Sequence, residues 1–141
     1  MRTFKRGRLV GIVLAQFVAL AHVGWTQTSQ TLQNRIPKPD PKKYHAIQDG
    51  KDWKNPKLVI RPEGIEIIGI TPVGRAIPVE SVPGVLERLP DSAWPYGLVV
   101  AAWDIGIISS SRDLPLIKAN GAKLLKVLKA HGIVVDLWPS A

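Results

Sequence analysis

Residues Gly97–Trp103 read GLVVAAW, an unbroken apolar run between Pro95 and Asp104. A strand with one face in solvent would alternate apolar and polar residues, and this run does not. A short, continuously apolar run bounded in this way is typical of a strand buried on both faces. The run therefore predicts a strand that other parts of the chain cover on each side.

A helix and a further strand follow this run. Between Leu114 and Leu128 apolar residues recur at helical spacing, and lysines occupy the other side. Pro115 suits the first turn of a helix, and Gly132 suits a C-terminal stop. Ile133–Trp138 (IVVDLW) predicts the last strand. Because strand–helix–strand connections are almost always right-handed, we expect this strand to run parallel to the first.

Two strands and a shorter helix are expected before the apolar run. Leu58–Arg61 and Ile65–Ile68 flank Pro62-Glu63-Gly64, which favours a hairpin turn because glycine tolerates positive φ. From Ser81 to Leu89, apolar residues fall one helical turn apart, and Pro90 ends the pattern.

The expected fold is a two-layer α/β sandwich, in which two helices lie on one face of a small mixed sheet. The predicted order is β-β-(β)-α-β-α-β, and Arg75–Pro78 is the optional short edge strand. Residues 58–141 form the expected domain. The prolines near the optional strand place it at an edge, because proline donates no ladder hydrogen bond.

Residues 1–25 are predicted to be a signal peptide or an N-terminal membrane anchor. Four basic residues precede the apolar span Leu9–Trp25, and Ala19-Leu20-Ala21 resembles a signal-peptidase site. The alternative is an uncleaved anchor, since a helix of this length spans about 26 Å of a hydrocarbon core roughly 30 Å thick. Both interpretations export the rest of the chain.

Residues 26–57 are predicted to be a flexible tether. This stretch is rich in Gln, Thr, Lys and Pro and has little apolar periodicity. Pro37, Pro39 and Pro41 alternate, which favours extended polyproline II backbone. Tyr44 and Trp53 are its two candidate anchors, and the alternative is that they pack on the edge of the domain.

The positive charge is concentrated ahead of the predicted domain. The formal charge is +8, but residues 58–141 carry eight basic and eight acidic side chains. The excess therefore suits an export segment and a tether near anionic surfaces, and we expect no nucleic-acid partner. The absence of cysteine excludes disulfides, thiol catalysis and cysteine-bound zinc.

Three residues, Trp94, Tyr96 and Asp104, are the candidate partner-binding residues. Trp94-Pro95-Tyr96 falls in a predicted loop, where exposed aromatic rings are common recognition anchors. Asp104 ends the buried strand, which is where α/β sheets place functional groups. The alternatives are that the rings plug the edge of the sheet and that Asp104 is a satisfied turn residue.

The motifs do not indicate an enzyme. His45 and His131 are the two histidines beyond the leader, and no metal-site, nucleophile-elbow or phosphate-loop spacing is present. Ser109–Ser111 are better explained as capping the helix after Asp113. A small hydrolase that uses Asp104 and one of these serines is the weaker alternative. We therefore expect no catalytic residues, no cofactor and no metal.

The chain has a basic start, one apolar span and a proline-rich stretch, followed by VVAAWD over 99–104 and LLKVLKAHGIVVDLW over 124–138. In these features it resembles the ExbD/TolR biopolymer-transport family, and the resemblance of the domain covers residues 58–138. The resemblance implies a bacterial envelope protein with a periplasmic domain that works with a polytopic proton-channel partner. The family's span carries an aspartate, whereas Leu9–Trp25 has no carboxylate. We therefore expect no proton-relay activity of its own.

The expected function is that of an exported binding or coupling domain. The expected location is the periplasm, or the inner membrane with the domain in the periplasm if the leader is retained. Its partner would be an envelope protein or a cell-wall polymer, and a homodimer is a further expectation. The alternative function is a freely secreted domain that binds a ligand or the cell wall.

Overall fold

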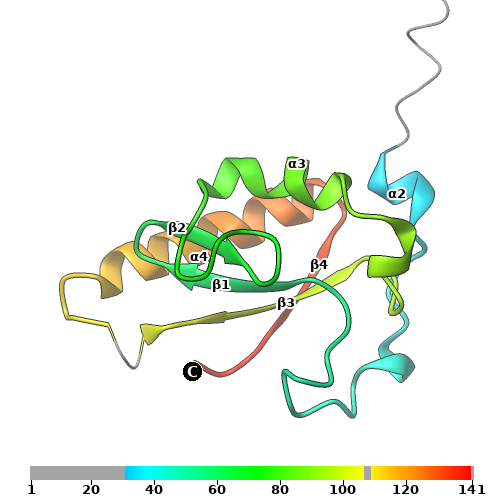
Figure 1. Ribbon diagram of the computed structural model, residues 1–141, viewed down its shortest axis with the longest axis horizontal. Coiled ribbons are helices and arrows are strands. Elements are labelled where there is room, and N and C mark those ends of the chain that lie inside the picture. The colour runs from blue at the N-terminus through cyan, green and yellow to red at the C-terminus, as the bar shows by residue number, and fades with distance from the viewer. Residues whose placement is uncertain (1–30, 107–108, 141) are drawn as a thin grey trace, which may run out of the picture. The chain divides into compact units, whose positions relative to one another are not determined.

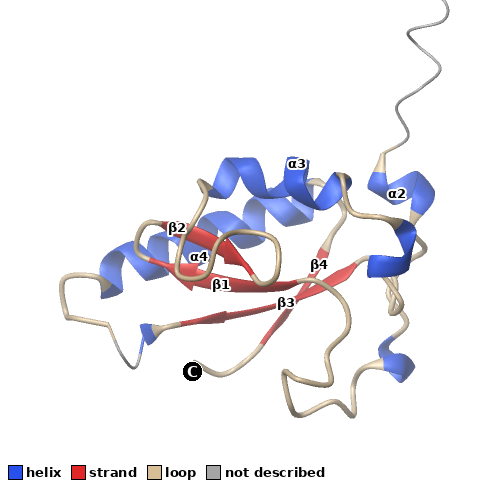
Figure 2. Cartoon of the chain, viewed as in Figure 1, coloured by secondary structure: helices blue, strands red, loops and turns tan. Residues whose placement is uncertain are grey.

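A four-stranded mixed sheet in the order β2-β1-β3-β4 forms the centre of the protein (Figures 1 and 2). The computed structural model describes residues 31–106 and 109–140. β1 (Lys57–Arg61) pairs antiparallel with β2 (Gly64–Ile67). β3 (Val99–Asp104) lies parallel to both β1 and β4 (Val134–Leu137). The predicted hairpin, central strand and parallel last strand are confirmed.

Two helices, α3 (Val82–Glu87) and α4 (Leu114–Ala130), lie on one face of this sheet. α3 connects β1–β2 to β3, and α4 connects β3 to β4, so the two crossovers advance across the sheet in the same direction. The handedness rule applies to the parallel strands β3 and β4, which α4 connects, whereas α3 connects antiparallel strands. Both helices contribute to one buried cluster, which places them on the same face. The described residues also contain three short 3₁₀ turns: Pro41–Lys43, Val79–Ser81 and Asp91–Ala93.

The predicted optional strand, Arg75–Pro78, is reduced to a single bridge. Ile65 and Ile77 exchange two backbone hydrogen bonds of 2.9 and 2.8 Å. Gly64 has a φ of +145°, and a Cβ on it would lie 2.2 Å from the carbonyl oxygen of Ile77. The hairpin glycine is therefore required both by its backbone conformation and by this close approach.

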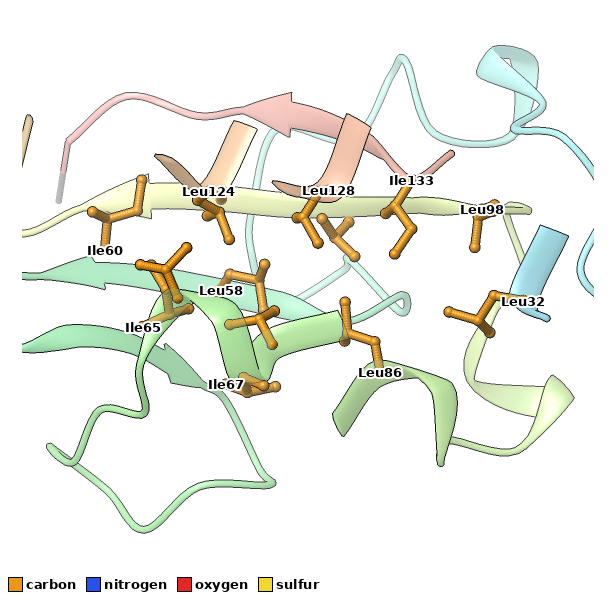
Figure 3. Packing of buried hydrophobic residues seen from close by; sticks show 14 of the residues in the cluster. Leu32, Leu58, Ile60, Ile65, Ile67, Leu86, Leu98, Leu124, Leu128 and Ile133 are labelled. Atoms are coloured by element: carbon orange, nitrogen blue, oxygen red, sulfur yellow. The ribbon is translucent and has the colours of Figure 1, made fainter. Parts of the chain in front are cut away.

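Aliphatic side chains fill the space between the sheet and the helices (Figure 3). Leu58 of β1 and Ile65 of β2 are fully buried there, as are Leu124 and Leu128 of α4. These residues alternate along the strands and recur at helical spacing along α4, as the sequence pattern predicts. We call this cluster the helix-face core.

The residues that precede β1 are packed on the domain, so the predicted tether is wrong for residues 31–56. α2 (Leu32–Arg35) adds Leu32 to the helix-face core. On the opposite face of the sheet, Trp53 is 2% exposed and clusters with Val99 and Ala101 of β3. Thr31–Ala141 is one compact unit. A few large rings bury enough apolar area to fix a segment that has no periodicity.

Backbone hydrogen bonds also attach this early segment to the start of β3. Leu98 donates to the carbonyl of Pro37 at 2.9 Å, and Asp40 donates to the carbonyl of Tyr96 at 3.0 Å. Gly97 has a φ of +87°, and a Cβ on it would lie 2.5 Å from the carbonyl oxygen of Lys38. Asp40 has extended backbone, but Pro41 begins the 3₁₀ turn Pro41–Lys43, so the expected extended run does not continue through the third proline, and the segment is paired with the rest of the domain.

The predicted leader, residues 1–25, lies outside the described residues. Within residues 31–106 and 109–140, no helix combines the length and the apolar composition that a membrane span requires.

Candidate functional site

Trp94 and Tyr96 are buried, so the expectation that they are exposed anchors is wrong. Trp94 is 3% exposed and belongs to the helix-face core, and Tyr96 is 8% exposed on the opposite face. The Tyr96 hydroxyl donates to the carbonyl of Asp52 and accepts from the amide of Lys54, each at 3.2 Å. Both rings are structural, because the segment predicted to be a tether covers the loop that carries Tyr96.

Asp104 lies at the carboxyl end of β3, as predicted. Its Oδ1 accepts hydrogen bonds from the Gly106 amide at 2.9 Å and from the Ser140 hydroxyl at 2.6 Å. These contacts fit the alternative interpretation, a satisfied turn residue. Trp94 and Tyr96 precede the opposite end of the same strand, so the structure does not bring the three candidate residues together.

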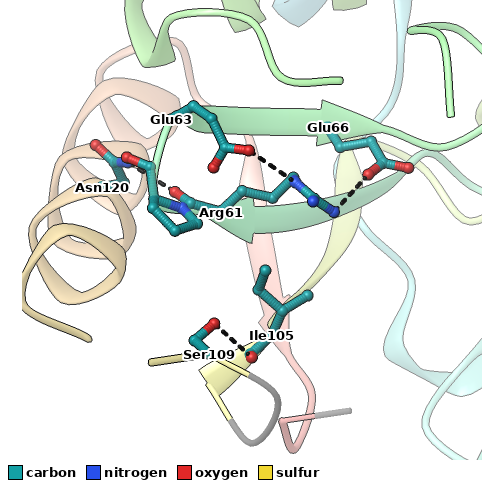
Figure 4. A network of polar contacts seen from close by, with 7 residues as sticks. Arg61, Glu63, Glu66, Ile105, Ser109 and Asn120 are labelled. Carbon is teal, nitrogen blue, oxygen red and sulfur yellow. Dashed lines mark hydrogen bonds and ion pairs between the residues drawn. The ribbon is translucent and has the colours of Figure 1, made fainter. Parts of the chain in front are cut away.

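An open hollow of about 610 Å³ lies at the carboxyl edge of the sheet, beside the start of α4. Figure 4 shows the polar contacts of this region: the Arg61 guanidinium lies 3.5 Å from Glu63 and 3.1 Å from Glu66. Two carboxylates, those of Glu63 and Glu66, therefore compensate the positive charge of Arg61. The lining consists of charged, hydroxyl and apolar side chains: Arg61, Pro62, Glu63, Ile105, Ser109, Ser110, Asp113 and Leu116.

The serines of this hollow bind neighbouring groups of the same loop. The Ser109 hydroxyl donates to the carbonyl of Ile105 at 2.9 Å, and Ser110 Oγ lies 3.0 Å from an oxygen of Asp113. Nucleophilic catalysis needs a base within hydrogen-bond reach of the hydroxyl and a third group that orients that base. These contacts instead hold the turn that enters α4.

The two described histidines lie away from this hollow. His45 Nδ1 lies 2.8 Å from the carbonyl oxygen of Pro41, and His131 Nδ1 lies 3.8 Å from Glu87. Neither imidazole lines the hollow with Ser109 and Ser110. Within the described ranges, no three His, Asp or Glu side chains converge into a group that could hold a metal ion.

Five aromatic rings form a continuous cluster on the sheet face opposite the helices. Trp53 is at its centre, with ring-centroid distances of 5.3 Å to Tyr44, 5.1 Å to Tyr96 and 5.8 Å to Trp138. Trp103 lies 6.5 Å from Trp138. We call this set the aromatic layer. The strand pattern places Trp103 and Trp138 on neighbouring strands, but no local pattern joins Tyr44 and Trp53 to them.

The half-buried edge of the aromatic layer forms a second, smaller hollow. Its volume is about 210 Å³, and Gly50, Trp103, Trp138 and Pro139 line it. The Trp138 indole donates to a carboxylate oxygen of Asp136 at 3.0 Å. This hollow has two indole rings and few polar groups, so it is suited to stacking against a ligand and not to proton transfer.

Two ionisable groups outside these hollows have shifted pKa values. Burial raises the pKa of the Tyr44 phenol, and the negative charges of Asp136 and Asp40 raise it further. The exposed Glu80 has a lowered pKa, because Lys123 binds its carboxylate. Both shifts arise from packing and ion pairing, and neither group lines a hollow described above.

Comparison with family models, with curated proteins and with solved structures finds no match for the chain.

Proposed function

We propose that this chain is an exported binding or coupling domain, similar to the periplasmic domain of ExbD/TolR proteins and without proton-relay activity of its own. One observation carries this proposal: hydroxyl groups of the chain bind within their own loop, whereas apolar side chains of the last strand are exposed. Ser109 and Ser110 bind within their own loop, whereas Val134 and Leu137 of the last strand are exposed. A surface of this kind favours contact with a partner over chemistry.

The family resemblance is the guide to the partner that we propose. β3 ends at Asp104, and α4 leads through His131-Gly132-Ile133 into the last strand. These are the residues on which the resemblance rests. A polytopic envelope protein is the partner that this proposal names.

A freely secreted domain that binds the cell wall is the second candidate. The hollow between Trp103 and Trp138 favours it, because paired indole rings on a surface offer flat apolar faces to a sugar ring or a similar ligand. The two candidates differ in whether the leader is retained.

Fractionation of cells that express the full chain separates these candidates. The proposal predicts a full-length protein in the inner-membrane fraction, with the domain accessible to protease from the periplasmic side. Crosslinking there should recover a polytopic membrane protein. A soluble periplasmic protein that starts near His22 would instead support the secreted alternative.

A variant in the apolar span gives the matched control. Val13→Arg interrupts Leu9–Trp25 with a charge, so the chain should remain in the cytoplasm. Cytoplasmic location of the unchanged chain would contradict export, and with it both candidates.

A further inference from the structure

The two edges of the sheet are protected differently. Along β2, Ile77 pairs with Ile65 through two backbone hydrogen bonds, and the segment that follows β2 includes Pro72 and Pro78. β4 pairs with β3 alone. Natural sheets usually block an exposed edge, because unpaired backbone groups recruit other strands. In the part of the chain that the structure describes, the β2 edge is blocked and the β4 edge is open.

The hydrogen-bond register shows which groups of β4 face the open side. Val134 donates to Leu98 at 3.1 Å, and Trp138 donates to Ala102 at 2.8 Å. Because backbone groups point in alternate directions along a strand, Val135 and Leu137 direct their N–H and C=O groups away from β3. These two residues therefore offer the donors and acceptors that an added strand needs.

The side chains beside this edge are apolar on both faces of the sheet. Val134 is 46% exposed on the face of the aromatic layer, and Leu137 is 58% exposed on the helix face. A groove of about 340 Å³ runs between β4 and α4. Its lining combines aliphatic side chains with one lysine: Leu125, Lys129, Gly132, Ile133, Val134 and Val135.

The charge beside the groove is positive on the helix face. Lys118 and Lys129 fall about 20° and 40° from Leu125 around α4, and both are exposed. No described acidic side chain lines the groove. On the other face of β4, Asp136 accepts from the Trp138 indole. The two faces therefore differ in charge, and acidic groups of a partner fit only the helix face.

We propose that β4 accepts an extended peptide as a fifth strand, with acidic side chains toward α4 and apolar side chains toward Val134. Backbone pairing with Val135 and Leu137 would bind it, and Lys129 would select its charge. This inference deepens the proposed function and rests on it, because it names the surface and the partner chemistry of a binding domain.

Charge argues against the other occupants of this edge. A second copy that paired through β4, with its helices on the same face, would bring Lys118 and Lys129 of both copies to one seam. Residues 1–21 of this chain carry four basic and no acidic side chains, so they do not complement the groove. An acidic segment of another protein therefore complements the groove, whereas a second copy of this chain and residues 1–21 do not.

The test uses the full chain, ¹⁵N-labelled in non-ionic detergent, and two blocked heptapeptides. One peptide alternates valine with glutamate, and the other alternates valine with lysine. The glutamate peptide should shift the amide signals of Ile133–Trp138 and slow amide exchange at Val135 and Leu137. The lysine peptide should bind about tenfold more weakly or not at all. Equal binding of the two peptides, or no binding, would overturn the inference.

Matched variants and a dilution series complete the test. Lys129→Glu should weaken binding of the glutamate peptide about tenfold, whereas Arg75→Glu, an exposed position beside β2 at the opposite edge of the sheet, should leave the affinity unchanged. If both variants bind the glutamate peptide equally well, Lys129 does not select the charge of the partner. If Val135 and Leu137 are protected without peptide and lose that protection on dilution, the occupant is a second copy and the inference fails. Neither outcome changes the fractionation result, so the two proposals fail separately.

Discussion

The two faces of the sheet are covered in different ways. On one face, α3 and α4 contribute aliphatic side chains at helical spacing to the helix-face core. On the other, a segment with few regular elements places Tyr44 and Trp53 against the sheet. Val99, Val100, Ala101 and Ala102 are all fully buried between these layers. β3 is therefore buried by a layer on each face of the sheet. Only the helical layer has a periodic sequence.

The largest effect is expected at Trp53, the centre of the aromatic layer. Trp53→Ala removes a ring that is 2% exposed and packs on three other rings, so unfolding should become about 3–5 kcal/mol easier. Urea unfolding followed by circular dichroism measures this. Trp138→Ala, at the half-buried edge of the same layer, is the control and should cost less. If both variants lost little stability, and lost it equally, the aromatic layer would contribute little to the free energy of unfolding.

Asn55 should have the next largest effect, because it is buried and satisfies three backbone groups. Its amide donates to the carbonyls of Gly97 and Val99 at 2.8 Å each, and its oxygen accepts from the Tyr96 amide at 3.0 Å. Asn55→Ala should cost about 3 kcal/mol, since these groups lose their partner. Asn55→Asp is the sharper comparison, because it keeps the acceptor and sets a carboxylate against two carbonyls. An Asp variant as stable as the wild type would contradict this role.

A smaller effect is expected at Arg35, which joins α2 to the end of α3. Its guanidinium donates to the carbonyls of Glu87 at 3.1 Å and Leu89 at 3.4 Å. Arg35→Ala should therefore cost about 1–2 kcal/mol in thermal or urea unfolding. Arg88→Ala, an exposed arginine at the end of the same helix, should change stability by less than about 0.5 kcal/mol. Similar losses of stability in the Arg35→Ala and Arg88→Ala variants would show that the contacts of Arg35 contribute no more than an exposed arginine does.

The smallest effect concerns the ionisation of Tyr44. Its phenol pKa is raised above 10.0 by burial, then by Asp136 and Asp40. The associated stability is present below the unfolded pKa and is lost as the pH rises through the folded pKa. Asp136→Asn should lower the phenol pKa toward its ordinary value, as followed by the Tyr44 ring signals in an NMR titration. An unchanged titration would show that Asp136 does not act on this phenol.

Periodicity predicts one side of this molecule well. Ile65, Leu124 and Leu128 occupy the core positions that strand and helix spacing indicate, and Gly132 ends α4 with a φ of +72°. The apolar run of β3 also predicts cover on both faces. Helices on only one face could not supply it, so the run itself implies a further covering segment. Composition alone cannot identify residues 31–56 as that segment, because its contacts depend on a few rings and on pairing with distant backbone.

The candidate site residues show the same limit. Asp104 falls where the strand pattern places it, but its partner Ser140 is distant in sequence. The exposure of Trp94 and Tyr96 depends on whether another segment covers their loop. The local sequence pattern around this loop does not indicate whether such a segment exists. The open edge of β4 follows from the strand order β2-β1-β3-β4, which places β4 at the end of the sheet. The sequence predicts a parallel last strand but not the order of the strands in the sheet.

Residues 31–56 belong to the folded domain, and Tyr44 and Trp53 within them form its second layer. Native-state hydrogen exchange at Asp40 measures whether this segment is attached to the sheet. The Asp40 amide donates to the carbonyl of Tyr96, whereas Val100 lies in the central strand and serves as the reference. Exchange at Asp40 should be slowed roughly a thousandfold or more relative to an unstructured peptide. Trp53→Ala should reduce this protection. If Asp40 instead exchanges at the rate of an unstructured peptide while Val100 stays protected, the segment is a tether and does not form part of the domain.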